Sequence, residues 1–230
     1  METAFCFRHP ETARYFESWL APCGPSGHAV KVPASDFQEW QEKWGRTDNP
    51  YTEFGLSVFR ASDHLLPYGR CAFHSAAVLW RGRAILFTAP SGTGKTTQMK
   101  NWLKRFPGES AVINGDKPIL SEEDDGILVW PSPWKGKERI GNDTLCAKLG
   151  GIVLLEQGSR NQLRLLQVRE AVEPLMKRFL CTVEDRESVE AMCALEEAIL
   201  TSVPVWKLVN TGDMESTELV FEALKKEIGS

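Results

Sequence analysis

The chain has 230 residues, of which 25% are charged, and its formal net charge at pH 7 is −4. An acidic balance of this kind lacks the basic surface that nucleic-acid-binding proteins need. No apolar run approaches the roughly 18 residues of a membrane-spanning helix, and the N-terminal residues lack the layout of a signal peptide. We therefore expect a cytoplasmic protein that binds neither nucleic acid nor membranes.

The six cysteines are scattered along the chain. They form no Cys-x-x-C pair, and no histidine stands beside them at the spacing of metal ligands. Reduced structural thiols are therefore favoured over a disulfide framework or a zinc site.

Residues 1–68 are predicted to form a separate small α/β layer, with a possible role in binding a partner or substrate. Short strands are expected near residues 3–8 and 30–32. Ser35 and Gln38 have the form of a capping box that opens a helix, and a second helix is expected over residues 51–66.

Three aromatic side chains share one face of the first of these helices. Phe37, Trp40 and Trp44 follow helical spacing. Bulky periodic aromatics of this kind favour a core or interface stripe over a platform for stacking bases.

A β-rich run at residues 71–79, a tight turn at Arg81 and Gly82, and an apolar strand at residues 84–88 come next. Two adjacent antiparallel strands depart from the simplest nucleotide-binding layout, in which the phosphate loop lies between parallel strands. We therefore expect a mixed sheet rather than an all-parallel one.

A phosphate-binding loop follows this strand, with alanine in place of the usual first glycine. Such a loop directs backbone N–H groups and a helix N-terminus at one phosphate. Lys95 would reach the β- and γ-phosphates of ATP, and the Thr96 hydroxyl would serve Mg²⁺. The alternative is a glycine turn without a ligand. The expected nucleotide-binding residues are Ala89, Pro90, Ser91, Gly92, Thr93, Gly94, Lys95, Thr96 and Thr97.

Asn114, Gly115 and Asp116 directly follow the next apolar strand. Asn-Gly favours the positive φ angles of a type I′ hairpin turn. Equally, Asp116 stands where a carboxylate that holds Mg²⁺ or accepts a substrate proton is commonly found. The residues alone leave both interpretations open.

Two further loops carry charge. The acidic run at residues 121–126 lies between two short strands, which favours a solvated hairpin turn over a metal site. Residues 130–139 form a proline-stiffened loop with the cations Lys135, Lys137 and Arg139. These cations could meet phosphate or an acidic partner, or form a simple basic surface turn.

The remaining chain is predicted to form structural strands and helices without functional residues. Residues 151–155 have the continuous apolar character of a buried strand, and residues 161–167 are expected to pair nearby. Helical stripes are predicted over residues 168–179 and 189–200, then a last strand at 203–209 and a closing helix around 219–224.

The central block resembles the catalytic core of the HPr serine kinase family. The resemblance rests on residues 74–78, the strand at 84–88, the phosphate loop and residues 113–116. In HPr kinases a histidine precedes the loop at the same spacing as His74. That family shares its fold with ATP-dependent phosphoenolpyruvate carboxykinases. The resemblance implies an α/β fold with a mixed-sheet P-loop kinase core over residues 69–230.

The resemblance also implies roles for single residues. Lys95 and Thr96 match the family's phosphate-binding lysine and metal-binding hydroxyl, and His74 matches a histidine near the transferred phosphate. Asp116 matches the second of two adjacent aspartates, whereas Gly115 stands at the first. The pair divides metal binding and proton abstraction, so a chain with one aspartate must combine the roles, recruit another base or be impaired.

The expected function is that of a kinase that uses ATP and Mg²⁺ to phosphorylate a serine or threonine hydroxyl on a small protein or peptide. Residues 1–68 do not resemble the N-terminal domain of HPr kinases, so HPr itself is not the expected acceptor. Shorter relatives that phosphorylate a peptide precursor or carrier resemble the layout better. A nucleotide-binding regulator or pseudokinase, and a kinase of a small metabolite such as free serine, remain alternatives. A homo-oligomer is possible.

Overall fold

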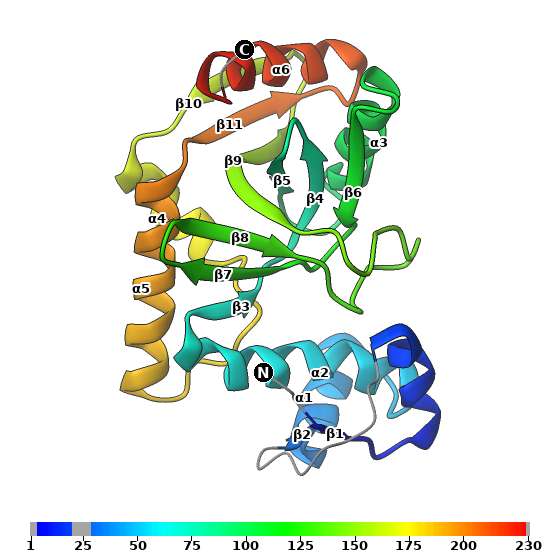
Figure 1. Cartoon of the computed structure of the whole chain (residues 1–230). Coiled ribbons are helices and arrows are strands. Elements are labelled where there is room, and N and C mark those ends of the chain that lie inside the picture. Colours follow the sequence, from blue (N-terminus) through cyan, green and yellow to red (C-terminus); the bar gives the residue numbers. More distant parts are fainter. Residues whose placement is uncertain (1–3, 20–28, 229–230) are drawn as a thin grey trace.

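The structure is a computed structural model and describes residues 4–19 and 29–228. A nine-stranded mixed sheet forms its centre, with helices on both faces and a small layer below it (Figure 1). The strands of this sheet are β3 (Arg70–Ala72), β4 (Ser75–Trp80), β5 (Arg83–Thr88), β6 (Ser110–Asn114), β7 (Ile119–Glu123), β8 (Gly126–Trp130), β9 (Ala147–Gln157), β10 (Gln162–Leu165) and β11 (Val205–Asn210).

The sheet forks along its longest strand, β9. One edge of β9 pairs in parallel with β5. Its other edge pairs first with β8, at Ala147 and Lys148, and then in parallel with β11 from Ile152 onward. The β3–β7–β8 ribbon therefore diverges from the part of the sheet that contains β10, β11, β5, β4 and β6. The predicted mixed sheet is confirmed, and β10 pairs with β11 rather than with β9.

The hairpin of β4 and β5 is formed as the sequence predicts. Its strands pair antiparallel from Ser75 and Thr88 to Trp80 and Arg83. Most of both strands is fully buried, because helices cover both faces of the sheet at this point. The phosphate loop thus leaves the centre of the sheet rather than its edge.

Two hydrophobic clusters hold the helices to the two faces. On one face α3 (Lys95–Arg105) and α6 (Met214–Ile228) pack through Trp102 and Val220. On the other face α4 (Val168–Met176) and α5 (Arg186–Ser202) pack through Leu175 and Leu195. The first stripe predicted on this side ends earlier than expected, at Met176, because Phe179 instead forms a bridge with Phe73 of the sheet.

The N-terminal layer has its own parallel pair of strands, β1 (Ala4–Cys6) and β2 (Ala29–Lys31). It also contains η1 (Pro10–Trp19), α1 (Ala34–Trp44), α2 (Pro50–Leu65) and η2 (Leu66–Tyr68). The fully buried Glu53 of α2 accepts the backbone N–H groups of Arg8 and His9 and the hydroxyl of Thr12. This carboxylate therefore ties η1 to α2. The division at residue 69 stays a prediction.

One sequence prediction within this layer is wrong. Ser35 does not cap α1, which begins after Pro33 without a side-chain cap; the Ser35 hydroxyl instead lies 3.4 Å from the Asp36 carboxylate. Trp44 is 65% exposed, so the aromatic stripe is buried only at Phe37 and partly at Trp40. The helix ends at this point, and no described element covers Trp44.

The layer joins the rest of the chain through Trp134. Its indole Nε1 donates to Phe54 O at 3.0 Å and lies 3.1 Å from Ser57 Oγ, and its ring packs against Phe16. Arg60 of α2 pairs with Asp36 and also reaches Thr182 beyond α4. These contacts link α2 to one segment that precedes β9 in the sequence and to another that follows it.

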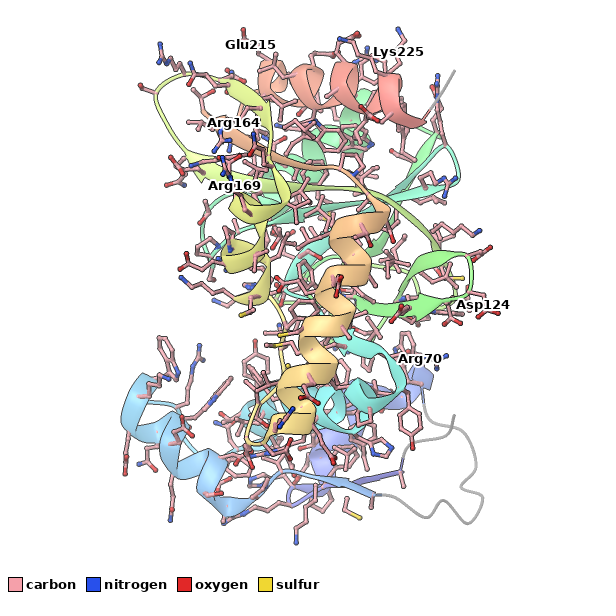
Figure 2. All side chains as sticks on the ribbon, turned by 90° about the vertical axis from the view of Figure 1, so that its left-hand side faces the viewer. Arg70, Asp124, Arg164, Arg169, Glu215 and Lys225 are labelled. Carbon is pink, nitrogen blue, oxygen red and sulfur yellow. The ribbon has the colours of Figure 1, made fainter. Side chains whose placement is uncertain are left out.

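The acidic run forms the predicted hairpin turn between β7 and β8, with Asp124 at its tip (Figure 2). Within residues 4–19 and 29–228, no cluster of His, Cys, Asp and Glu has the composition of a metal site. The described cysteines are free, while Cys23 lies outside the described residues. None of the described helices has the length and apolar character to cross a membrane.

Candidate functional site

The phosphate loop connects β5 to α3. Gly92 and Gly94 adopt φ angles of 82° and 105°, which only glycine adopts readily. Ala89 is buried and needs no positive φ, so an alanine fits where such loops usually begin with glycine. The expected strand, loop and helix are therefore present, with the N-terminus of α3 directly behind the loop.

Lys95, the first residue of α3, points back into this loop. It is 7% exposed, and Nζ donates to the carbonyl oxygens of Ala89 at 2.9 Å and Pro90 at 3.3 Å. Burial lowers the pKa of Lys95 to about 8; the Asp116 carboxylate opposes this effect, whereas the charges of Arg178 and Lys117 add to it. The amine thus lies in a cluster that already has excess positive charge.

Asp116 lies between His74 and Lys117. Its Oδ1 is 3.4 Å from His74 Nε2, and its Oδ2 forms an ion pair with Lys117 Nζ. Burial alone would raise the pKa of Asp116, but the hydrogen bond from His74 and the charge of Lys117 outweigh burial and hold the pKa well below its usual value. The carboxylate is therefore ionised at neutral pH.

The turn at Asn114 fixes the backbone of Asp116. Asn114 Oδ1 accepts the N–H groups of Asp116 at 2.9 Å and Lys117 at 2.8 Å, and Nδ2 donates to Ser132 O. Strand β6 pairs with β4, and β7 pairs with β3 and β8, so the residues between β6 and β7 do not form a hairpin. The hairpin interpretation of Asn114–Gly115 is therefore wrong.

His74 is fixed from three directions at the start of β4. Its N–H donates to Arg178 O at 2.8 Å, and its carbonyl oxygen accepts the hydroxyl of Thr88, directly before the phosphate loop. The neighbouring Ser75 N–H donates to Asp116 O at 3.0 Å. Three segments that are distant in sequence therefore meet at His74.

Arg178 is a member of this cluster that the sequence did not single out. Its Nε is buried without a hydrogen-bond partner, and burial lowers the pKa of its guanidinium. Arg178 stands in a segment that the sequence predicts as part of a helical stripe, and nothing in its position along the sequence indicates a functional residue. The bridge between Phe73 and Phe179 and the hydrogen bond from His74 N–H to Arg178 O bring it beside His74.

A covering loop, residues 131–143, lies against Asp116. A Cβ on Gly136 would lie 2.9 Å from Asp116 Cβ, and a Cβ on Gly115 would lie 2.8 Å from Ile140 O. Gly115 N–H also donates to Ile140 O at 2.9 Å. The covering loop therefore occupies the space that a side chain at position 115 would need.

The cations of the covering loop are partly engaged with other groups. Lys135 forms an ion pair with Asp143, and the Arg139 guanidinium lies 5.8 Å from the centre of the Tyr15 ring. Lys137 is exposed. Lys135 and Arg139 therefore already have partners within the protein.

The carboxyl ends of β5, β9 and β11 meet at the phosphate loop, as expected for parallel strands with a ligand site at one end. Gln157 at the end of β9 lies with Nε2 3.5 Å from Gly92 O. Thr96 is half-buried and Thr97 is exposed, with its methyl group near Gly212 after β11. Asn101 of α3 donates to Gly212 O at 3.1 Å.

The donor set near the loop fits a nucleotide-bound magnesium ion. Mg²⁺ in phosphate-transfer sites commonly takes one or two protein oxygens and completes its shell with phosphates and water. The Thr96 hydroxyl and the Asp116 carboxylate are such oxygens. The cations Lys95, Lys117 and Arg178 outnumber this single carboxylate, so the cluster as a whole suits an anionic ligand.

A hollow in the surface lies elsewhere. It has a volume of about 390 Å³ and is lined by Gln162, Leu163, Arg164, Lys207 and Val209, on β10 and β11. Strand β6, which leads to Asp116, is at the other edge of the sheet. Arg164 in this hollow is paired with Glu170, and it shares no contact with the phosphate loop. The candidate site is therefore identified by the arrangement of residues at the phosphate loop and not by a hollow in the surface.

No protein-family model and no curated protein sequence matches the chain. Among solved structures, the chain is similar to the HPr(Ser) kinase/phosphatase from Coxiella burnetii, with 12% sequence identity and a TM-score of 0.39. The similarity covers 69% of this chain and 99% of that chain. A TM-score this low does not establish a common fold, so the site geometry alone supports the assignment that follows.

Proposed function

We propose that the protein is an ATP- and Mg²⁺-dependent kinase with a P-loop core of the HPr kinase and phosphoenolpyruvate carboxykinase type. The observation that carries this proposal is the cluster at the phosphate loop, where Asp116 contacts His74 and Lys117, and where Lys95 lies within range of the charges of Asp116, Lys117 and Arg178. Phosphoryl transfer depends chiefly on positioning and on stabilising negative charge. A cluster rich in cations beside a phosphate loop meets both needs.

ATP binding would begin with the loop itself. The backbone N–H groups of residues 91–97 would hold the β- and γ-phosphates, and Lys95 would exchange the carbonyl oxygens of Ala89 and Pro90 for phosphate oxygens. Thr96 and Asp116 would hold Mg²⁺, which neutralises phosphate charge when bound. The Arg178 Nε, which is buried without a partner, would gain one in a phosphate oxygen.

The transfer step requires an acceptor hydroxyl in line with the γ-phosphate. The hydroxyl oxygen forms a bond to the γ-phosphorus while the bond to the bridging oxygen of ADP breaks, and the hydroxyl proton passes to Asp116. A carboxylate with a depressed pKa is a weak base, but a loose transition state needs little help from a base. His74 would keep the carboxylate oriented toward the acceptor.

The acceptor is proposed to be a serine or threonine on a small protein or peptide. The covering loop connects the surroundings of Asp116 to η1 of the N-terminal layer through Arg139 and Tyr15. An acceptor chain that enters at Asp116 would therefore meet this layer, whereas a small metabolite would not need it.

A nucleotide-binding regulator remains the second candidate. Both oxygens of Asp116 are engaged by His74 and Lys117, and the covering loop fills the space beside Gly115. A site held in this arrangement would bind ATP without transferring phosphate.

Transfer of radiolabel from γ-labelled ATP distinguishes these functions. Candidate acceptors are the products of neighbouring genes and free hydroxyl metabolites such as serine. The kinase proposal expects a labelled protein or peptide with the wild type and a loss of about 10²-fold or more with Lys95→Ala or Asp116→Asn. Nucleotide binding without transfer to any acceptor would support the regulator, and labelling of metabolites alone would exclude the protein-kinase version.

A further inference from the structure

Lys117 contacts the proposed catalytic carboxylate directly, although neither the spacing nor the resemblance assigns it a role. Its Nζ forms an ion pair with Asp116 Oδ2, and the two side chains are 24% and 22% exposed. An ion pair between neighbouring residues at the surface usually contributes little to stability. This one lies in the cluster of Lys95 and Arg178, which suggests a role in binding.

The backbone of Lys117 is fixed on both of its polar groups. Its N–H donates to Asn114 Oδ1 at 2.8 Å, and its carbonyl oxygen accepts the Ser132 hydroxyl at 2.5 Å. Asn114 and Ser132 are both fully buried and are hydrogen-bonded to each other. The side chain of Lys117 is therefore the part of this residue that can change partner.

Lys117 and Lys95 are close enough for their charges to interact. The charge of Lys117 contributes to the lowered pKa of Lys95, as does the charge of Arg178. Lys95 is repelled by these two like charges and attracted by the one carboxylate of Asp116, an arrangement that favours an additional anion. The phosphates of a nucleotide bound in the loop are that anion.

Asp116 cannot take up its proposed task while Lys117 holds it. His74 occupies Oδ1 and Lys117 occupies Oδ2. Each carboxylate oxygen keeps a further lone pair, but the ammonium at Oδ2 repels Mg²⁺ and opposes protonation, so the ion pair with Lys117 must weaken when the reaction begins. The group that arrives with ATP and is absent from ADP is the terminal phosphate.

We propose that Lys117 is a second phosphate-binding lysine, which leaves Asp116 for the terminal phosphate of ATP and so frees Asp116 Oδ2. This inference rests on the proposed binding of ATP at the loop. It adds that the site distinguishes ATP from ADP through Lys117. With ADP bound, Lys117 stays paired with Asp116, and the carboxylate remains engaged.

Calorimetric titration with ATP and with ADP, each in the presence of Mg²⁺, tests this assignment. Lys117→Met should weaken ATP binding by about tenfold or more, the usual loss for a charge-assisted hydrogen bond, and change ADP binding by less than about threefold. Lys148→Met is the matched control. Lys148 also forms an ion pair, with Asp125, but it lies beside the start of β5 and far from the phosphate loop. It should change neither affinity.

Acetylation of lysines in the wild-type protein, read by mass spectrometry, gives a second test that needs no variant. ATP should protect Lys117 more than ADP does, while Lys148 should be modified equally in both. Lys117→Arg should keep the preference for ATP because the charge remains.

Equal losses of ATP and ADP affinity in Lys117→Met, or no loss of ATP affinity, would overturn the inference. So would equal protection of Lys117 by the two nucleotides. A wild-type protein that binds neither nucleotide would overturn the proposed function, and this inference with it.

Discussion

Gly136 packs against Asp116 so closely that a Cβ on the glycine would lie 2.9 Å from Asp116 Cβ. Real Cβ atoms do not approach each other at this distance. The covering loop and the proposed catalytic carboxylate therefore hold each other in place, and glycine at position 136 makes the contact possible.

Gly136→Ala should reduce phosphoryl transfer by about 10²-fold, because a shift of about 1 Å in a reacting group has effects of this size. Gly108→Ala is its matched control: Gly108 has φ 77° against 76° for Gly136, but a Cβ there would meet nothing within 4 Å. Both variants pay the backbone strain of about 1 kcal/mol, and only Gly136→Ala should displace Asp116. Equal transfer rates in the two variants would show that the contact does not matter.

Gly115→Asp restores the aspartate pair of the resembling family but should not restore its chemistry. The new Cβ would meet two backbone oxygens, Ile140 O at 2.8 Å and Lys135 O at 3.2 Å. Forcing atoms into an occupied space typically costs about 1–3 kcal/mol, so urea unfolding should show this loss. Gly115→Ala should lose a similar amount, because the clash lies at Cβ. A faster and equally stable Gly115→Asp protein would contradict this account.

ATP affinity should fall as the pH rises through about 8. Burial lowers the pKa of Lys95 to about 8, so the amine loses its charge on the alkaline side of this value. Bound phosphate favours the charged amine and moves the decline to somewhat higher pH in the complex. Titration calorimetry of the wild type between pH 7 and 9.5 measures the decline, and Lys95→Met should lack it. An unchanged decline in Lys95→Met would assign it to another group.

Glu196 should make the protein less stable at neutral pH than at mildly acidic pH. It is buried on α5 with Oε1 unpartnered, and burial raises its pKa from 4.5 to about 7. A raised carboxyl pKa gives stability that is fully present below 4.5 and is lost as the pH rises through about 7.

Glu196→Gln should remove this loss, which is measured as the difference in the free energy of unfolding between pH 5 and pH 8. Glu197→Gln, at an exposed position on the same helix, is the control and should behave as the wild type does. If Glu196→Gln and the wild type lose equal stability over this range, Glu196 is not the group responsible.

The parts of the fold set by local pattern could be predicted from the sequence. Gly92 and Gly94 indicate the phosphate loop, and the apolar runs on either side of Arg81 and Gly82 predict the hairpin before it. The loop, Asp116 and His74 could be named because their residue types carry the chemistry. The structure brings them together without testing their roles.

Contacts made across long stretches of chain could not be predicted. Arg178 reaches the site because its segment is hydrogen-bonded to His74 and Phe179 bridges to Phe73. The covering loop fills the space at Gly115, and its Trp134 is anchored on α2. Neither of these contacts produces a periodic pattern in the sequence. Ser35 shows the opposite failure, because the capping-box pattern is clear in the sequence but α1 begins after Pro33 without a side-chain cap.

The central claim is that ATP binds at the phosphate loop beside Asp116. Calorimetric titration of the wild type, Lys95→Met and Lys148→Met with ATP and Mg²⁺ tests it most directly, because no acceptor needs to be known. The account predicts saturable one-to-one binding by the wild type and Lys148→Met, and an affinity at least about tenfold lower in Lys95→Met. No binding by the wild type, or equal binding by Lys95→Met, would contradict it.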